Sequence, residues 1–75
     1  MNSGRPVKRS LTLRGHRTSV SLEDAFWTAF RDIASRDGQT INGLAASIDA
    51  ARGDVGLASA IRVFVLQDAQ AAHKN

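Results

Sequence analysis

The sequence predicts a mostly α-helical domain with a short β ribbon near its N-terminal end. Apolar and polar residues alternate on both sides of Gly15-His16, and alternation with a period of two is typical of strands. Three later segments repeat apolar residues at spacings of three and four, which is typical of amphipathic helices. Glycines separate these segments. The expected order is therefore a strand region followed by three helices.

The alternating segment admits two strand arrangements. Leu11 and Leu13 occupy odd positions, whereas Val20 and Leu22 occupy even ones, so one straight strand would place the two pairs on opposite faces. A tight turn between the pairs would bring all four onto one face of a hairpin. The alternative is a single strand over residues 18–22, preceded by flexible chain.

In the hairpin arrangement we expect the turn at Gly15-His16, because glycine at the first turn position suits a type II′ turn. Arg14 would then lie opposite Arg17 and Leu13 opposite Thr18. The polar face of such a hairpin would carry Ser10, Thr12, Arg14, Arg17, Ser19 and Ser21.

The first two helices have start and stop signals. Ser21 is expected to cap the first helix, with acidic residues following in its first turn, and Gly38 to end it. Thr40 is expected to cap the second helix, which Arg52-Gly53 closes. The apolar stripes of these two helices are Phe26, Ala29, Phe30 and Ile33, and then Ile41, Leu44, Ala45 and Ile48.

A third helix is predicted from Leu57 onward, and its apolar face is wider than one small domain can cover. This stripe consists of Leu57, Ile61, Phe64, Val65 and Leu66. We therefore expect part of it to pack against a second chain. The expected organisation is a flexible basic arm over 1–8, one domain over 9–70 and a frayed tail over 71–75.

Length and composition also favour self-association. The chain has 75 residues and no cysteine, and a fold of this size keeps much of its surface in water. Disulfides, metals or oligomerisation usually stabilise such domains. Because cysteine is absent and His16 and His73 lie far apart, we expect a homodimer with no metal and no other cofactor. The absence of cysteine also fits a cytoplasmic location.

Basic residues are concentrated at the N-terminal end. Residues 1–17 carry five Lys or Arg and no acid, giving +5, whereas residues 18–75 carry five basic and seven acidic residues, giving 5 − 7 = −2. This polarity indicates a polyanionic partner, although a solubilising tail would show the same composition. No apolar run approaches the roughly 20 residues of a membrane span, and no signal peptide is expected.

Several segments together resemble a known family. Residues 18–23 (Thr-Ser-Val-Ser-Leu-Glu), the stripe Phe26, Phe30 and Ile33, and residues 37–42 (Asp-Gly-Gln-Thr-Ile-Asn) are similar to ribbon-helix-helix proteins of the Arc/MetJ kind. Lys8-Arg9-Ser10 and residues 57–66 resemble a short bacterial subgroup of that family. The resemblance covers about residues 8–68, and the third helix is additional to the minimal family unit.

The resemblance implies an intertwined homodimer in which each chain contributes one strand to an antiparallel ribbon that enters the DNA major groove. It implies base contacts by Arg17, Ser19 and Ser21, since Arg and Ser can bond to base edges. Phosphate contacts are expected from Arg5, Lys8, Arg9, Arg14, His16, Thr40, Ile41 and Asn42. The expected dimer interface and core are Val20, Leu22, Phe26, Trp27, Phe30, Ile33, Ile41, Leu44, Ile48, Ile61, Phe64 and Val65.

The sequence therefore predicts a DNA-binding transcription regulator, such as a repressor, with double-stranded DNA and a second copy as partners. An enzyme is not expected, because Glu23 and Asp24 are explained by the helix dipole and no phosphate loop or nucleophile motif is present. Two alternatives stay open. The chain could be an antitoxin that binds a toxin protein, or a dimeric interaction adaptor that does not bind DNA.

Overall fold

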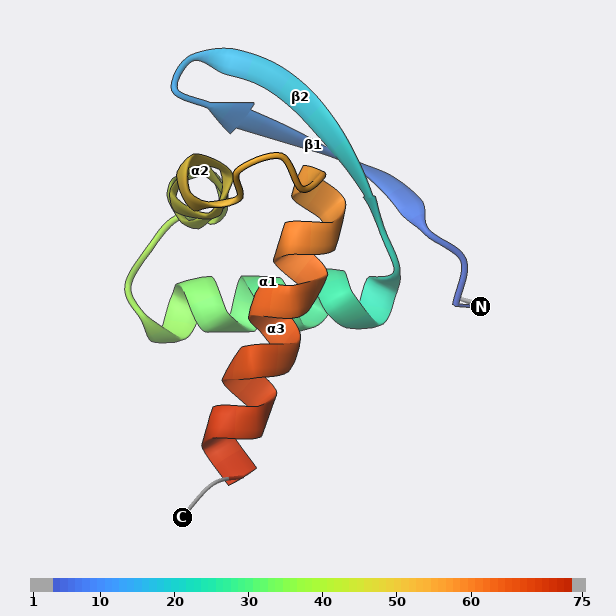
Figure 1. The fold of residues 1–75 in the computed structure, drawn as a ribbon, viewed down its shortest axis with the longest axis vertical. Coiled ribbons are helices and arrows are strands. Elements are labelled where there is room, and N and C mark those ends of the chain that lie inside the picture. Colours follow the sequence, from blue (N-terminus) through green and yellow to red (C-terminus); the bar gives the residue numbers. More distant parts are fainter. Residues whose placement is uncertain (1–3, 74–75) are drawn as a thin grey trace.

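A computed structural model describes residues 4–73 as a β hairpin that lies across three helices (Figure 1). Strands β1 (Val7–Leu13) and β2 (His16–Leu22) form a two-stranded antiparallel sheet. Helices α1 (Asp24–Arg36), α2 (Ile41–Ala51) and α3 (Leu57–His73) follow. The predicted fold class, a mostly helical domain with a short β ribbon and an extra C-terminal helix, is confirmed. No helix in the described part is both long and apolar enough to cross a membrane.

The hairpin turn lies one residue earlier than expected, at Arg14-Gly15. Both residues have positive φ angles, 52° and 83°, which is the pattern of a type I′ turn rather than type II′. Leu13 therefore pairs with His16 and Thr12 with Arg17. The type I′ turn prevails because its twist matches that of the strands and glycine occupies its second position.

The same residues nevertheless face the core as expected. Moving the turn by one residue changes the partner of each β1 residue by two positions along β2. Because side chains alternate with a period of two, their direction is unchanged. Leu11, Leu13, Val20 and Leu22 are buried against the helices. The outward face carries Lys8, Ser10, Thr12, Arg17, Ser19 and Ser21, all exposed. The single-strand alternative is excluded by this pairing.

The two strands pair with each other within one chain, and pairing between strands of two chains, which the resemblance implies, stays a prediction. The two-residue turn joins β1 directly to β2, and Leu11, 3% exposed, shares the core with Leu22, 0% exposed. Burial of these side chains fixes both strands over the same helices. The helices of a single chain thus supply the layer beneath the hairpin.

The start of α1 differs from the expectation that Ser21 is its cap. Ser21 belongs to β2, the N-cap position is Glu23, and no side chain caps the helix. Extended backbone through Leu22 moves the helix start beyond the reach of the Ser21 hydroxyl. Instead, Arg62 of α3 bonds to this junction, as described below.

The junction of α1 and α2 follows the expected signals. Gly38 has a φ of 68°, its N–H bonds to the Ser35 oxygen, and the Gln39 N–H bonds to the Ala34 oxygen. This is a Schellman motif, which ends a helix at a left-handed residue. The Thr40 hydroxyl then accepts a hydrogen bond from the Gly43 N–H at 2.9 Å and caps α2.

Two boundaries lie outside the expected ones. β1 begins at Val7, so Val7 and Lys8 belong to the strand and not to the arm, because they pair with Leu22 and Ser21. α3 continues to His73, three residues beyond the expected end of the domain, and Arg36 of α1 bonds to its Asp68 at 2.8 Å. The rest of the expected arm and tail, residues 1–3 and 74–75, lies outside the described residues.

The core is continuous from the hairpin through all three helices. Phe30, Leu22 and Ile61 are its largest fully buried side chains. The residues expected in the core or dimer interface are either buried here or packed against the buried cluster. Leu11, Leu13, Ala34 and Ala45 are also buried. Val63 and Leu66 of α3 stay 50% and 54% exposed, so the apolar face of that helix is only partly covered by its own chain.

Candidate nucleic-acid interface

The outward face of the hairpin is a polar, acid-free surface. Lys8 and Arg17 supply positive charge, and four residues supply hydroxyl groups: Ser10, Thr12, Ser19 and Ser21. Ser10 lies opposite Ser19, and Thr12 lies opposite Arg17, so side chains of both strands project together. Arginine and hydroxyl groups are suited to hydrogen bonding with DNA base edges and phosphates.

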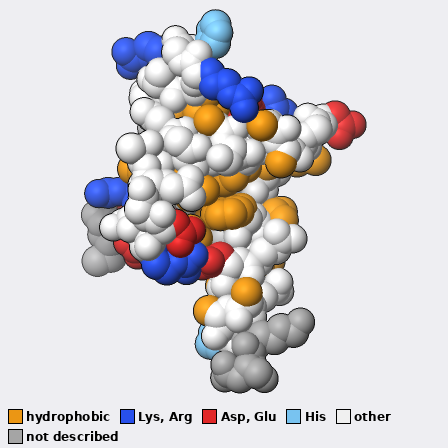
Figure 2. All heavy atoms as spheres, turned by 90° about the vertical axis from the view of Figure 1, so that its left-hand side faces the viewer, with side chains coloured by type: hydrophobic (Ala, Val, Ile, Leu, Met, Phe, Trp, Pro, Cys, Tyr) orange, Lys and Arg blue, Asp and Glu red, His pale blue; other side chains and the backbone are white. Residues whose placement is uncertain are grey.

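Two further basic side chains lie at the hairpin turn. Arg14 is exposed in the turn itself, whereas His16, the first residue of β2, pairs with Leu13 on the inward side of the ribbon. Both border a hollow of about 380 Å³ that reaches Asp49 and Arg52 at the end of α2. In Figure 2, which faces this side of the molecule, Lys, Arg and His side chains gather at the hairpin end.

Arg9 does not share the outward face with the other basic residues. It pairs with Val20 on the inward side, where its guanidinium lies 5.4 Å from the centre of the Trp27 ring and bonds to Asp24 and to the Leu22 oxygen. Its side chain is 16% exposed. The expectation that Arg9 contacts phosphate does not fit this position, because the strand alternation turns its side chain toward the helices.

Arg62 of α3 forms hydrogen bonds with the end of β2 and with the residue that precedes α1. Its Nη2 donates to the Ser21 backbone oxygen at 3.0 Å, and its Nε donates to the Glu23 carboxylate at 3.0 Å. The hydrogen bond from Arg62 lowers the pKa of Glu23 below its ordinary value. Ser21 thus keeps its outward direction while its backbone oxygen is bound to the helical layer.

The start of α2 lies against the edge of β1. The Asn42 side-chain oxygen accepts a hydrogen bond from the Thr12 backbone N–H at 3.0 Å. Thr40 and Asn42 are exposed, whereas Ile41 is partly buried. The expected phosphate-binding helix end is therefore adjacent to the ribbon, and the helix dipole favours an anion there. Arg5 is exposed just before β1.

Comparison with protein families identifies this arrangement. The family described as "Ribbon-helix-helix domain" matches residues 6–69, which include both strands, α1, α2 and most of α3. The chain belongs to the ribbon-helix-helix domain family. No significant match was found among curated proteins or among solved structures.

Ribbon-helix-helix is a DNA-binding fold and typically has no enzymatic activity, and its members in general suggest DNA-binding regulators or antitoxins. The fold also suggests dimerisation. Within residues 4–73, His, Asp and Glu side chains do not gather in any group of three that could hold a metal ion.

Sequence reasoning missed part of this ribbon-helix-helix surface. Ser10 and Thr12 were placed on the polar face by alternation, but the resemblance implied only one strand per chain and assigned base contacts to β2 alone. Arg62 was also missed, because its partners Ser21 and Glu23 are about 40 positions away in sequence. No local pattern reveals such a contact.

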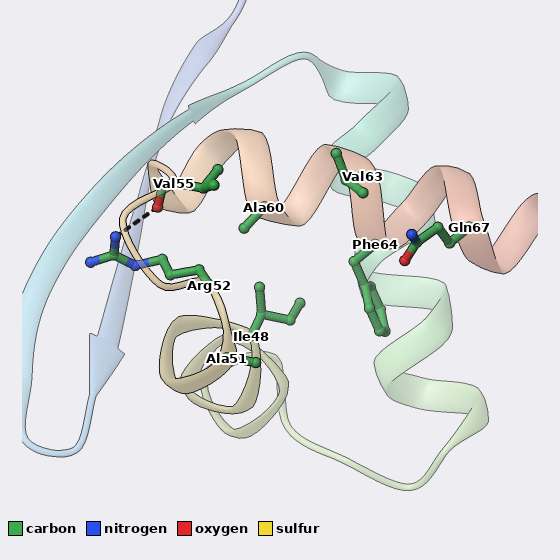
Figure 3. A pocket seen from close by; sticks show the side chains of 8 residues that line it. All are labelled: Ile48, Ala51, Arg52, Val55, Ala60, Val63, Phe64 and Gln67. Atoms are coloured by element: carbon green, nitrogen blue, oxygen red, sulfur yellow. Dashed lines mark hydrogen bonds between the residues drawn. The ribbon is translucent and has the colours of Figure 1, made fainter.

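A second surface of the ribbon-helix-helix domain lies between α2 and α3, and Arg52 borders both this groove and the hollow beside the hairpin turn. A groove of about 310 Å³ is lined mainly by apolar side chains (Figure 3). Ile48 and Phe64 form its floor, and Val55 and Val63 are 47% and 50% exposed at its sides. Arg52 crosses one end and donates to the Val55 oxygen at 2.7 Å.

Proposed function

We propose that this protein is a sequence-specific double-stranded DNA-binding regulator, acting as a repressor in a bacterial cytoplasm. The proposal places the outward face of the hairpin in the major groove, which admits a two-stranded ribbon. The observation that carries it is the exposed face on which Lys8 and Arg17 accompany four hydroxyl side chains without any acid. The flanking basic groups Arg5 and Arg14 would add attraction to phosphates.

Arg17 has the best position for reading a base among these residues. It is exposed on β2, directly opposite Thr12. A guanidinium can donate two hydrogen bonds to guanine, whereas a single hydroxyl makes weaker and less selective contacts. Ser19 and Ser21, further along β2, are proposed to add contacts to neighbouring bases. Thr40 and the backbone of Ile41 and Asn42 are proposed to hold a flanking phosphate.

Binding to duplex DNA tests this proposal directly. Preferred sites are selected from random duplexes, and the affinity for the best site is measured between about 50 and 200 mM salt, over which phosphate binding weakens steeply. Arg17→Ala should cost about 1–3 kcal/mol and relax the sequence preference. Arg31→Ala, at an exposed position of α1, is the matched control. Absence of duplex binding at the lowest salt would refute DNA binding.

We further propose that two copies associate through the exposed apolar part of α3 and the adjacent groove. Val63 and Leu66 are half exposed on this helix, and their burial against the same surface of a second copy would remove apolar area from water. Two ribbons would then contact two half-sites of an operator.

The solution mass tests the dimer. Leu66→Lys and Val63→Lys place charge on the proposed interface without touching the buried core, so each should convert the dimer to a monomer with little loss of stability. Ser35→Lys, on exposed α1, should leave the mass unchanged. A natural chain that is monomeric by light scattering at micromolar concentration would exclude this interface.

An antitoxin role is the second candidate, and the same apolar groove favours it. A toxin segment with apolar side chains could occupy the space between Ile48 and Phe64. Co-expression with the product of the neighbouring gene separates the two roles. A stable complex that Val63→Lys disrupts would support the antitoxin, whereas a complex of identical chains supports the regulator alone.

A further inference from the structure

We propose that the hollow beneath the hairpin turn binds a small organic anion, a molecule that carries one carboxylate or phosphate group on a short apolar body. The hollow has a volume of about 380 Å³ and lies between the turn end of the hairpin, the C-terminal part of α2 and the first residue of α3. The binding of this ligand does not depend on the proposed function, whereas its predicted effect on DNA binding rests on it.

The first observation is that the helices leave the inward face of β2 open near the turn. His16 pairs with Leu13, and Thr18 pairs with Leu11. Residues directly opposite each other in an antiparallel ribbon project from the same face, so both polar side chains point toward the helical layer. The two leucines are buried, with 3% and 9% exposed, whereas His16 and Thr18 are exposed and line the hollow. An imidazole and a hydroxyl group therefore face an open space and not a packed core.

The second observation is an excess of positive charge around this hollow. Arg14 borders it from the turn, and Arg52 borders it from the end of α2. Among the described residues that line it, Asp49 is the one acid, and the Arg52 Nε donates to its carboxylate at 2.7 Å. The Arg52 Nη1 donates to the Val55 oxygen at 2.7 Å, which holds the guanidinium in place (Figure 3). Arg52 thus compensates Asp49, and the charge of Arg14 has no acidic partner among the lining residues.

The third observation is that the rest of the lining is apolar. Leu13 of β1, Ala46 of α2 and Leu57 of α3 contribute its hydrophobic part. A hollow of this volume with an apolar lining and a few polar groups is typical of sites for small ligands. The end of α2 and the start of α3 both border it. Because their helix dipoles present opposite signs there, the charge of the ligand is selected by the side chains.

These observations define the ligand by its chemistry. An inorganic anion could satisfy Arg14 but would leave the three apolar residues facing water. A neutral apolar molecule would cover those residues but would remove Arg14 from water without giving it a partner, which costs free energy. A small molecule with an anionic group and an apolar body meets both requirements. The Thr18 hydroxyl and the His16 imidazole could donate further hydrogen bonds to the anionic group.

The same ligand should weaken DNA binding if the proposed function holds. Arg14 is proposed to attract a phosphate of the duplex, and a ligand bound to its guanidinium occupies that charge. Because the coupling between two ligands is reciprocal, duplex DNA should weaken the binding of the anion by the same factor. The hollow would then be an effector site of the regulator.

Titration of the natural full chain with four probes tests the site. Benzoate and phenyl phosphate carry an anionic group on an apolar ring, benzamide has nearly the shape of benzoate without its charge, and inorganic phosphate has the charge without the ring. We expect benzoate or phenyl phosphate to bind at least about tenfold more tightly than the other two probes, because a charge-assisted hydrogen bond adds to the apolar contact. Backbone NMR signals of residues 13–18 and 46–57 should shift on binding.

Three results would overturn the inference. The first is that neither aromatic anion binds at millimolar concentration, which includes the case of a second copy that covers the hollow. The second is equal affinity for benzoate and benzamide, because the charge would then play no part. The third is a set of NMR shifts confined to Val63, Phe64 and Gln67, which would place the probe in the apolar groove between α2 and α3.

Two variants test whether the probe lies in the hollow. Arg14→Gln removes the charge, keeps an unbranched side chain in the turn and should weaken benzoate binding about tenfold. Ala46→Leu fills the apolar part of the hollow with a good helix former and should abolish binding. Arg31→Gln, on exposed α1, is the matched control and should leave the affinity unchanged. Natural affinity in either hollow variant, with circular dichroism showing that it is folded, would refute the site.

The outcomes distinguish this inference from the proposed function. If the natural chain binds no duplex DNA, the proposed function fails, and the titration still decides whether the hollow is an anion site. If benzoate binds there, saturating benzoate should weaken binding to the preferred duplex by about fivefold or more. The comparison sample contains sodium chloride at the same ionic strength, since salt alone weakens DNA binding. An unchanged affinity for the duplex would refute the effector role while the anion site stands.

Discussion

Arg62 in α3 joins the end of the ribbon to the helical layer by donating to the Glu23 carboxylate and to the Ser21 backbone oxygen, each at 3.0 Å. The same guanidinium lies 5.9 Å from the centre of the Phe26 ring. One side chain of α3 thereby contacts β2, the N-cap of α1 and the first turn of α1. The third helix is part of the structure that holds the ribbon in place.

Arg62→Gln should lower the thermal unfolding midpoint, because it removes the charge-assisted bond to Glu23 and weakens the bond to Ser21. Faster hydrogen exchange at the end of β2 should accompany the loss, since Arg62 holds the Ser21 backbone oxygen there. Arg31→Gln on exposed α1 is the control. Equal unfolding midpoints for the two variants would show that the contact contributes nothing to stability.

The ion pair between Arg62 and Glu23 should make the stability of the fold depend on pH. Arg62 lowers the pKa of Glu23 in the folded chain, so the carboxylate stabilises the fold above its ordinary pKa. This contribution should disappear as the pH falls through the lowered folded value. Glu23→Gln should therefore unfold more easily than the natural chain near neutral pH, and the difference should vanish in acid. A difference that persists unchanged to pH 2 would contradict this assignment.

The turn residue Arg14 has a φ of 52°, a conformation that is unfavourable for arginine. Arg14→Asn should raise the free energy of unfolding by about 1 kcal/mol, because asparagine tolerates the left-handed region better. It should also reduce the salt dependence of DNA binding by about one charge if Arg14 contacts phosphate. Chemical denaturation and salt titration measure the two effects. Arg14→Lys retains the charge and serves as the control for the second.

Arg9 and Lys8 are adjacent in sequence, but substituting them should have different effects. The change at Arg9 should lower stability, and the change at Lys8 should weaken DNA binding. Arg9→Met removes the bonds to Asp24 and Leu22 and should lower the free energy of unfolding by about 1–2 kcal/mol, with little change in the salt dependence of DNA binding. Lys8→Met, on the exposed face, should leave stability within about 0.5 kcal/mol and weaken DNA binding. The reverse result would place Arg9 at the DNA surface.

Leu11 tests whether β1 belongs to the folded core. Leu11→Ala should cost about 2–5 kcal/mol of stability, because the side chain is 3% exposed and its removal leaves a cavity. Val7→Ala, at a position 41% exposed, should cost less than about 1 kcal/mol. Similar small effects at both positions would mean that β1 behaves as an arm and not as a strand.

The strength of sequence reasoning differs among these elements. The helix stripes around Phe30, Leu44 and Ile61 are predictable because each depends on residues three and four positions apart. Gly38 and Thr40 are likewise local signals, and each ends or begins a helix as expected. The cap of α1 was mistaken because extended pairing through Leu22 overrides the local capping preference of Ser21.

By itself, the sequence determined the family, the number of helices and which side of the ribbon faces the core, because alternation and helical spacing are properties of neighbouring residues. Tertiary structure decided the register, the inward position of Arg9, and the hydrogen bonds that join Asn42 to the Thr12 N–H and Arg62 to the Ser21 oxygen. These features depend on which distant groups meet. A +5 charge over residues 1–17 could not distinguish a mobile basic arm from a hairpin with one basic side chain turned inward.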